Sequence, residues 1–170
     1  MALDEQSRLR PRPALPHPDV RIAIVVARFH EELTGAMLAS ATKELVAAGV
    51  KPANVLVAFV PGSFELPVVA DRAANADVDA VLALGVVIEG ETTHDHWVAH
   101  GAVTGLMHIA LETGVPIHLG VLTCATMEQA RARALPPELG GKEDKGREVA
   151  RAALETLAAL DSVARWDRKR

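Results

Sequence analysis

The chain has 170 residues, 49% of them hydrophobic, which is enough to bury the core of one domain. A formal net charge of −4 at pH 7, with no long basic run before the last six residues, gives no electrostatic basis for binding nucleic acid. The single cysteine, Cys124, excludes an intramolecular disulfide and fits a reducing compartment. Because no apolar run reaches the roughly 18 residues of a membrane span and no signal-peptide pattern is present, we expect a cytoplasmic protein that does not contact membranes.

The sequence pattern predicts an arm, strands and helices in chain order. Residues 1–20 hold four prolines and several charges without periodicity, which predicts an extended arm. Continuous apolar, β-branched runs then predict buried strands at 21–27, 55–60, 78–87 and 117–123. Helical patterns follow them at 31–48, 64–74, 94–113, 127–134 and 147–164. We therefore expect one α/β domain over residues 21–164 and a solvated tail over 165–170.

This alternation of strands and helices predicts a parallel sheet covered by helices on both faces. In such sheets, ligands bind beyond the carboxyl ends of the strands. Four loops leave those ends, and we expect them to meet at one rim; they are 28–30, 61–65, 88–94 and 123–126. The sequence has no GxGxxG, Walker or GxSxG motif, which disfavours dinucleotide, nucleoside triphosphate and serine-hydrolase chemistry.

The loop at 88–94, IEGETTH, carries the strongest chemical signal. A strand, a Gly-containing loop and a helix N-terminus present backbone N–H groups to an anion such as a phosphate ester. His94 would open that helix, whose dipole disfavours the protonated ring, so the imidazole could accept a proton. A plain connecting loop beside a solvated histidine would show the same residues, so both interpretations stay open.

Two phenylalanines follow the first two strands. Phe29 and Phe64, if exposed on one rim, could sandwich a flat heterocycle. The alternative is that each ring packs under a helix. Glu65 would open the second helix, where a carboxylate is favoured as a cap whether or not it binds a ligand.

Other polar residues are ambiguous. His96 and His100 have metal-ligand spacing on a helix, but no third ligand is evident. Cys124 follows a strand and reads as a small buried hydrophobe. Arg133 and Lys145 flank the last loop and are either solvated or reach an anion on a neighbouring chain.

Six blocks occur in order over about residues 21–160: RIAIVVARFHEELT, VPGSFELPVVA, LGVVIEGETTH, ETGVPIHLGVLT, MEQARARA and the KG that opens the last helix. Together they resemble the 6,7-dimethyl-8-ribityllumazine synthase family. The resemblance implies the penultimate step of riboflavin biosynthesis, in which 5-amino-6-(D-ribitylamino)uracil condenses with 3,4-dihydroxy-2-butanone 4-phosphate. It also implies that positioning and proton transfer govern the reaction, with no metal and no redox cofactor.

The resemblance assigns the site residue by residue. His94 would be the acid/base, and Phe29 would stack on the pyrimidine ring. The residues that would hold the ribityl chain or line the ring pocket are Ser63, Phe64, Glu65, Val86, Val87, Ile88 and Leu119. The residues that would bind phosphate are Glu91, Thr92 and Arg133, with Lys145 at the edge of the site. In the family, the residues matching Arg133 and Lys145 act across a subunit boundary.

Several positions depart from the family pattern. Glu89 stands where a basic residue is frequent, and Asp95-His96-Trp97 replaces an aromatic, an acid and a tyrosine. Leu119 replaces a common phenylalanine that covers the ring from the adjacent subunit, so stacking on the substrate could be one-sided. Cys124-Ala125 replaces a Thr-Asp pair, which we interpret as structural. None of these changes removes a proposed catalytic group.

The resemblance also implies an assembly. The family forms pentamers and, in some members, 60-subunit shells, with active sites at subunit interfaces. The segment between Arg133 and Lys145 is longer than in typical shell formers, which favours a homopentamer, and the N-terminal arm would lie against a neighbour. Riboflavin synthase is a candidate partner enzyme. The expected fold is a three-layer α/β/α domain with a four-stranded parallel sheet in the flavodoxin-like order 2-1-3-4.

Two other classes stay open at this level. A relative that binds a flavin or lumazine without turnover fits the changes at Leu119 and at residues 95–97. A metal-dependent enzyme using His96 and His100 would need stoichiometric metal.

Overall fold

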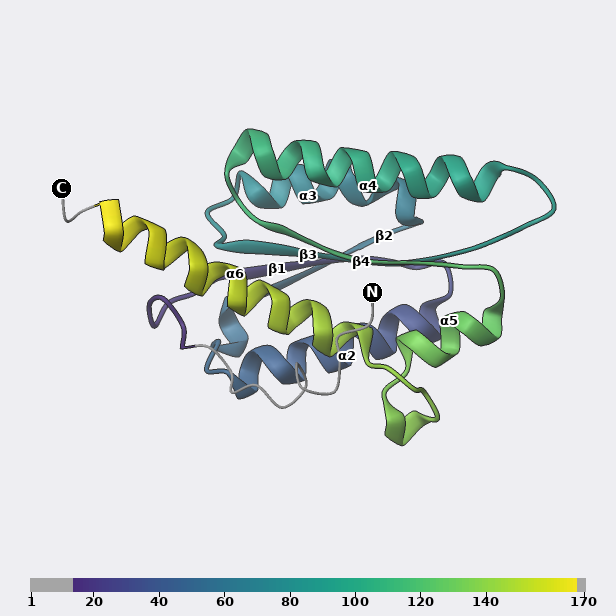
Figure 1. Cartoon of the computed structure of the whole chain (residues 1–170), viewed down its shortest axis with the longest axis horizontal. Coiled ribbons are helices and arrows are strands. Elements are labelled where there is room, and N and C mark those ends of the chain that lie inside the picture. The colour runs from purple at the N-terminus through teal and green to yellow at the C-terminus, as the bar shows by residue number, and fades with distance from the viewer. Residues whose placement is uncertain (1–13, 168–170) are drawn as a thin grey trace.

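The computed structural model describes residues 14–167, which form a four-stranded sheet between two layers of helices (Figure 1). The strands are β1 (Ile22–Ala27), β2 (Val55–Val60), β3 (Ala80–Ile88) and β4 (Ile117–Cys124). The helices are α2 (Glu31–Ala47), α3 (Leu66–Ala74), α4 (His94–Thr113), α5 (Met127–Ala134) and α6 (Lys145–Asp167). Three short 3-10 turns complete the fold, namely η1 (Pro52–Asn54), η2 (Ser63–Glu65) and η3 (Pro137–Leu139). Most of the expected arm, residues 1–13, and the end of the expected tail, residues 168–170, lie outside the described part.

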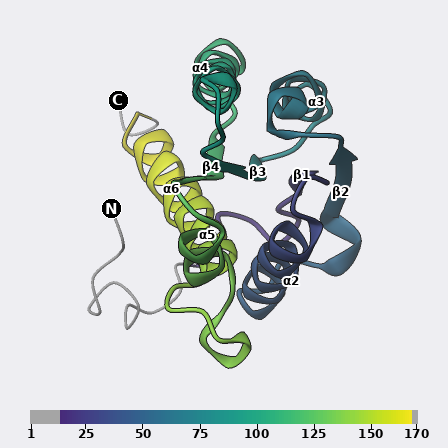
Figure 2. The ribbon, with the colours of Figure 1, turned by 90° about the vertical axis from the view of Figure 1, so that its right-hand side faces the viewer.

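The strand order is β2-β1-β3-β4 and every pairing is parallel, which confirms the expected topology. Helices α3 and α4 cover one face of the sheet, and α2, α5 and α6 cover the other (Figure 2). The central strand β1 is therefore buried along its whole length, which explains its unbroken apolar sequence. No helix among the described residues is long and apolar enough to cross a membrane.

The core consists of two clusters separated by the sheet. On the α2–α6 side, β1 contributes Ile22, Ile24 and Val26. On the α3–α4 side it contributes Ala23, Val25 and Ala27. This alternation follows from the two-residue period of a strand, and it fixes which helices each strand face supports.

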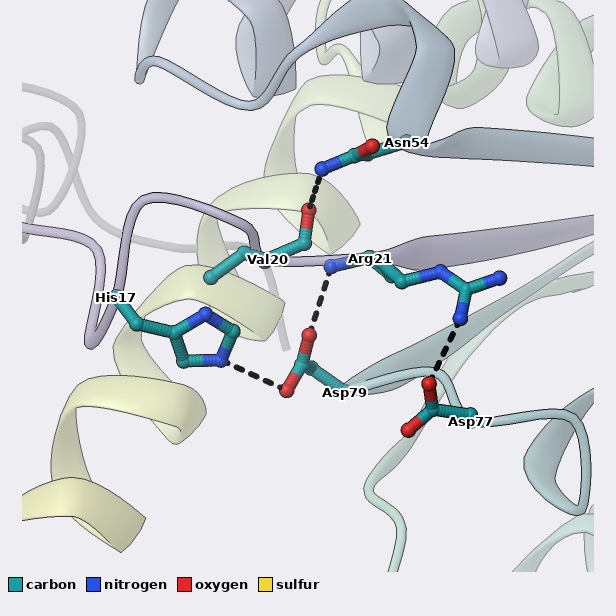
Figure 3. A network of polar contacts seen from close by, with 6 residues as sticks. All are labelled: His17, Val20, Arg21, Asn54, Asp77 and Asp79. Carbon is teal, nitrogen blue, oxygen red and sulfur yellow. Dashed lines mark hydrogen bonds and ion pairs between the residues drawn. The ribbon is translucent and has the colours of Figure 1, made fainter.

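A polar network holds the amino end of the sheet (Figure 3). The Asp79 carboxylate accepts a hydrogen bond from the Arg21 amide at 2.7 Å and lies 3.1 Å from the His17 ring nitrogen. The Arg21 guanidinium contacts Asp77 at 2.8 Å, and the Asn54 amide donates to the Val20 carbonyl at 3.2 Å. The network ties the chain before β1 to the loops before β2 and β3, so these strands start in register.

His118 is a half-buried polar residue on β4. It shares the strand face of Gly120, whose position borders Val149 of α6, so it points toward α6. The Nε2 atom is buried without a hydrogen-bond partner among the described residues. Burial lowers the pKa of His118 to about 4, so the ring is neutral at physiological pH.

Because the neutral form of His118 is favoured in the folded state, we expect the unfolding free energy to fall at acid pH. We expect His118→Leu to remove this sensitivity. The unfolded state regains the ordinary pKa of 6.5, so it binds the proton first, and His118 costs stability as the pH falls from 6.5 toward 4. Between pH 7 and pH 4.5 we expect the advantage of His118→Leu in unfolding free energy to grow by roughly 2–3 kcal/mol. Urea denaturation at both pH values measures it. An advantage of His118→Leu that stayed the same at both pH values would contradict the assignment.

Candidate active site

Parallel pairing brings the carboxyl ends of the strands to one edge, the right-hand end of the view in Figure 1. The segments after β1 and β2, the carboxyl end of β3 and the first turns of α4 line a pocket of about 450 Å³ there. The segment after β4, at 123–125, instead lines a second pocket of about 520 Å³. Three of the four loops expected to meet thus share a pocket.

The turn after β1 places an aromatic ring on this pocket. The Arg28 amide donates to the Val60 carbonyl at 2.8 Å, and the Phe29 amide donates to the Pro61 carbonyl at 3.1 Å, so pairing with the β2 chain continues past the strand. Phe29 is 68% exposed rather than packed under a helix. The open space at Gly62 lets this ring approach, because a Cβ there would lie 3.0 Å from Phe29 Cδ2.

The η2 turn shapes the next wall. The Gly62 amide donates to Glu65 Oε2 at 2.9 Å, which holds that carboxylate at the rim and leaves its second oxygen free of this bond. Ser63 is buried, and its Oγ has no hydrogen-bond partner among the described residues. A Cβ at Gly85 would lie 2.5 Å from that Oγ, so the hydroxyl points toward β3. Ser63 therefore reaches the pocket through its other atoms, not through the hydroxyl.

Gly101 of α4 leaves room for the ring of Phe64. Phe64 is 60% exposed and lies against Gly101, where a Cβ would come within 2.8 Å of Phe64 Cε2. The ring therefore depends on the bare backbone of α4 for its position. Phe29 and Phe64 both line the pocket, so the alternative in which each packs under a helix is wrong.

The third wall is the end of β3 and the start of α4. Val86, Val87 and Ile88 line the pocket, and His94, the first residue of α4, lies at its side. The His94 amide reaches Thr92 Oγ1 at 3.4 Å, and Thr93, at the N-cap position, makes no side-chain cap. The next amides of the first turn are thus open to an anion at the positive end of a 20-residue helix.

The structure brings most of the expected residues together. The expected residues that line the pocket are Phe29, Ser63, Phe64, Glu65, Val86, Val87, Ile88 and His94. The expected residues outside its lining are Glu91, Thr92, Leu119, Arg133 and Lys145. The lining residues not expected from the sequence are His30, Gly62, Asp95, Trp97 and Val98. Helical spacing from His94 could have found Trp97 and Val98, which lie three and four residues further on.

Two expected cations are engaged within the chain. Arg133 Nη1 donates to the Gln129 carbonyl of its own helix at 3.1 Å. Lys145 Nζ lies 2.7 Å from Glu148 Oε2 at the start of α6. Leu119 lies on the edge strand β4, with 47% of its surface exposed. One chain alone therefore does not place these three residues in the pocket.

The second pocket lies between α4 and the end of β4. His96 and His100 line it, with ring centroids 6.2 Å apart, together with Glu89 and Asp95. Within residues 14–167, no group of three or more His, Cys, Asp or Glu side chains is arranged to hold a metal ion. Cys124 is buried at its edge, and that burial raises the pKa of the thiol.

The contact between Phe64 and Gly101 predicts that a substitution at Gly101 changes folding stability and ligand binding in opposite directions. In Gly101→Ala, the new methyl group displaces the ring, while alanine favours the helix by about 1 kcal/mol. We expect binding of a flat heterocycle, with riboflavin as the probe, to weaken roughly 2- to 10-fold, the range of a lost aromatic contact. Calorimetric titration measures it. Gly105→Ala, on the same helix but facing Pro67, is the matched control, and equal effects in both variants would contradict this role.

Comparisons with known proteins point to one family. The family model described as 6,7-dimethyl-8-ribityllumazine synthase matches residues 19–161. A protein of that name from Thermus thermophilus is 48% identical over 155 residues, covering 90% of this chain and 96% of the relative. Another from Kineococcus radiotolerans is 50% identical, and one from Streptomyces coelicolor is 44% identical, each over 145 residues that cover 85% of this chain and 88% of the relative. The chain therefore belongs to the 6,7-dimethyl-8-ribityllumazine synthase family.

Proposed function

We propose that the protein condenses 5-amino-6-(D-ribitylamino)uracil with 3,4-dihydroxy-2-butanone 4-phosphate to 6,7-dimethyl-8-ribityllumazine. The observation that carries this proposal is one pocket lined by the exposed rings of Phe29 and Phe64 and by a histidine at an open helix N-terminus. A flat heterocycle fits the rings, and a phosphate ester fits the helix end. Family membership supplies the same reaction.

The aminouracil would lie on the β1–β2 side of the pocket. Phe29 would stack on one face of the pyrimidine ring, and the apolar carboxyl end of β3, residues 86–88, would contact the ring as well. Glu65 would accept hydrogen bonds from ribityl hydroxyls through the carboxylate oxygen that Gly62 does not occupy. Ser63 would act through its backbone, because its hydroxyl faces β3.

The phosphate would bind where α4 begins. The open amides of the first helical turn and of residues 91–92 would hold its oxygens. Arg133 would complete this site from a neighbouring copy, and Lys145 would lie at its edge, since neither lines the pocket of its own chain.

His94 would move the protons of the reaction. The 5-amino nitrogen attacks the ketone carbonyl, and loss of water leaves an imine. Removal of the carbon-bound proton next to the imine then expels phosphate and leaves an enol, which takes up a proton on its terminal carbon and becomes a new carbonyl. Attack by the ribityl-bearing nitrogen on this new carbonyl closes the ring with loss of a second water. His94 stands beside the proposed phosphate site and is exposed to the pocket, so it can take and return these protons.

Two exposed apolar surfaces at opposite edges of the sheet favour a ring of copies. Leu56 and Phe59 of edge strand β2 are exposed, and so are Leu119 of edge strand β4 and Met107 and Leu111 of α4. A contact between one surface and the other is head-to-tail, and such contacts form a ring when the rotation from copy to copy closes. We propose a homopentamer with active sites between copies; a 60-subunit particle in sedimentation would contradict it. The single buried, unpaired cysteine supports a cytoplasmic location.

A steady-state assay following lumazine absorbance tests the reaction. We expect turnover in the unmodified protein, a loss of roughly 100- to 10,000-fold in His94→Ala, and a raised KM for the butanone phosphate in Arg133→Ala. Arg131→Ala is the matched control, because Arg131 lies on the same helix and pairs with Glu32 at 3.0 Å. No turnover above background from a folded oligomer would contradict the proposal and favour a flavin-binding relative without activity.

A further inference from the structure

The turn between β1 and α2 holds His30 in an unusual backbone conformation. Its φ of 60° and ψ of 47° place it in the left-handed region. Among the described non-glycine residues, only Asp77, with a φ of 57°, also has a positive φ. This region costs a residue with a Cβ about 1 kcal/mol or more, and such costs cluster at functional sites.

Helix capping does not explain this conformation. A residue at the N-cap position is normally extended, and its side chain accepts a hydrogen bond from the first turn. His30 makes no side-chain cap, and only its carbonyl serves α2, accepting from the Leu33 amide at 2.8 Å and the Thr34 amide at 3.1 Å. Asparagine or glycine would take the same backbone conformation at lower cost.

The turn presents the His30 side chain to the pocket. Backbone pairing with the β2 chain persists to Phe29, and α2 begins at Glu31, so the chain reverses at His30 alone. His30 lines the pocket together with Phe29, and no described residue forms a hydrogen bond or ion pair with its imidazole. A sharp strained strand-to-helix turn of this kind presents the nucleophile in α/β-hydrolases.

Strand order gives the part of the substrate that His30 can reach. β1 lies between β2 and β3, so His30 lies between the η2 turn and the end of β3. The α4 N-terminus, where phosphate would bind, follows β3 instead. His30 is therefore on the side of the ring and its polyol chain.

We propose that His30 is a binding residue for the ribityl-bearing aminouracil, with its imidazole N–H donating to a ring carbonyl or a ribityl hydroxyl oxygen. The proposal rests on the proposed function and adds a contact that discriminates between the two substrates. The left-handed turn sets the direction of the imidazole, and the contact leaves the butanone phosphate untouched.

Substrate-specific kinetics test this proposal. His30→Gly keeps the left-handed backbone and removes the imidazole, so the KM for the aminouracil should rise roughly 3- to 10-fold, the loss of one hydrogen bond. The KM for the butanone phosphate should stay within about twofold. His30→Asn, which tolerates the backbone and retains a donor, should restore most of the affinity. Asp77→Gly is the matched control, because it also places a glycine at a left-handed position, but at the opposite end of the sheet.

An unchanged KM for the aminouracil in folded His30→Gly would overturn the proposal, as would equal changes for both substrates. If the unmodified protein shows no turnover, the proposed function fails, and calorimetric titration with riboflavin decides about His30 separately. Weaker riboflavin binding in His30→Gly than in Asp77→Gly would then support the contact. Equal binding, or no binding by the unmodified protein, would overturn it.

Discussion

The parallel pairing of β1 with both β2 and β3 is the constraint on which the rest of the structure depends. It directs three strand ends to one edge, so that a turn of a few residues after each strand suffices to build a pocket wall. It also buries β1 completely, which couples the site to the core. The polar network around Asp79 sets the strand starts at the opposite end, and the register carries that alignment through to the pocket (Figure 3).

The pocket wall depends on bare backbone as much as on side chains. Phe29 approaches Gly62, the Ser63 hydroxyl occupies the space at Gly85, and Phe64 lies on Gly101. Each aromatic ring remains exposed to a ligand because a glycine leaves room for it on the protein side. This arrangement lets a chain with only 3% aromatic residues present both phenylalanine rings to the pocket, which Trp97 also lines.

Much of the fold could be predicted from the sequence, because continuous β-branched runs report strands buried on both faces. The helix at 94–113 matches α4, whereas the last helix extends to Asp167, beyond the expected end at 164. The pocket residues followed from loop position and family resemblance, but the inward Ser63 hydroxyl did not, because it depends on the space at Gly85. The role of His30 was equally hidden, since a backbone dihedral leaves no mark in residue type when the residue is not glycine.

The central claim is that this pocket is half of a site that a second copy completes. Subunit complementation between His94→Ala and Arg133→Ala tests it most directly, by unfolding the two variants together, refolding them and assaying the mixture. If the two residues act from different copies in a head-to-tail ring, about a quarter of the interfaces regain both. At a butanone phosphate concentration far below the KM of Arg133→Ala, activity should then rise well above that of either variant refolded alone. If both residues acted from one chain, no mixed interface would hold both, and activity that stayed at the level of the separate variants would contradict the account.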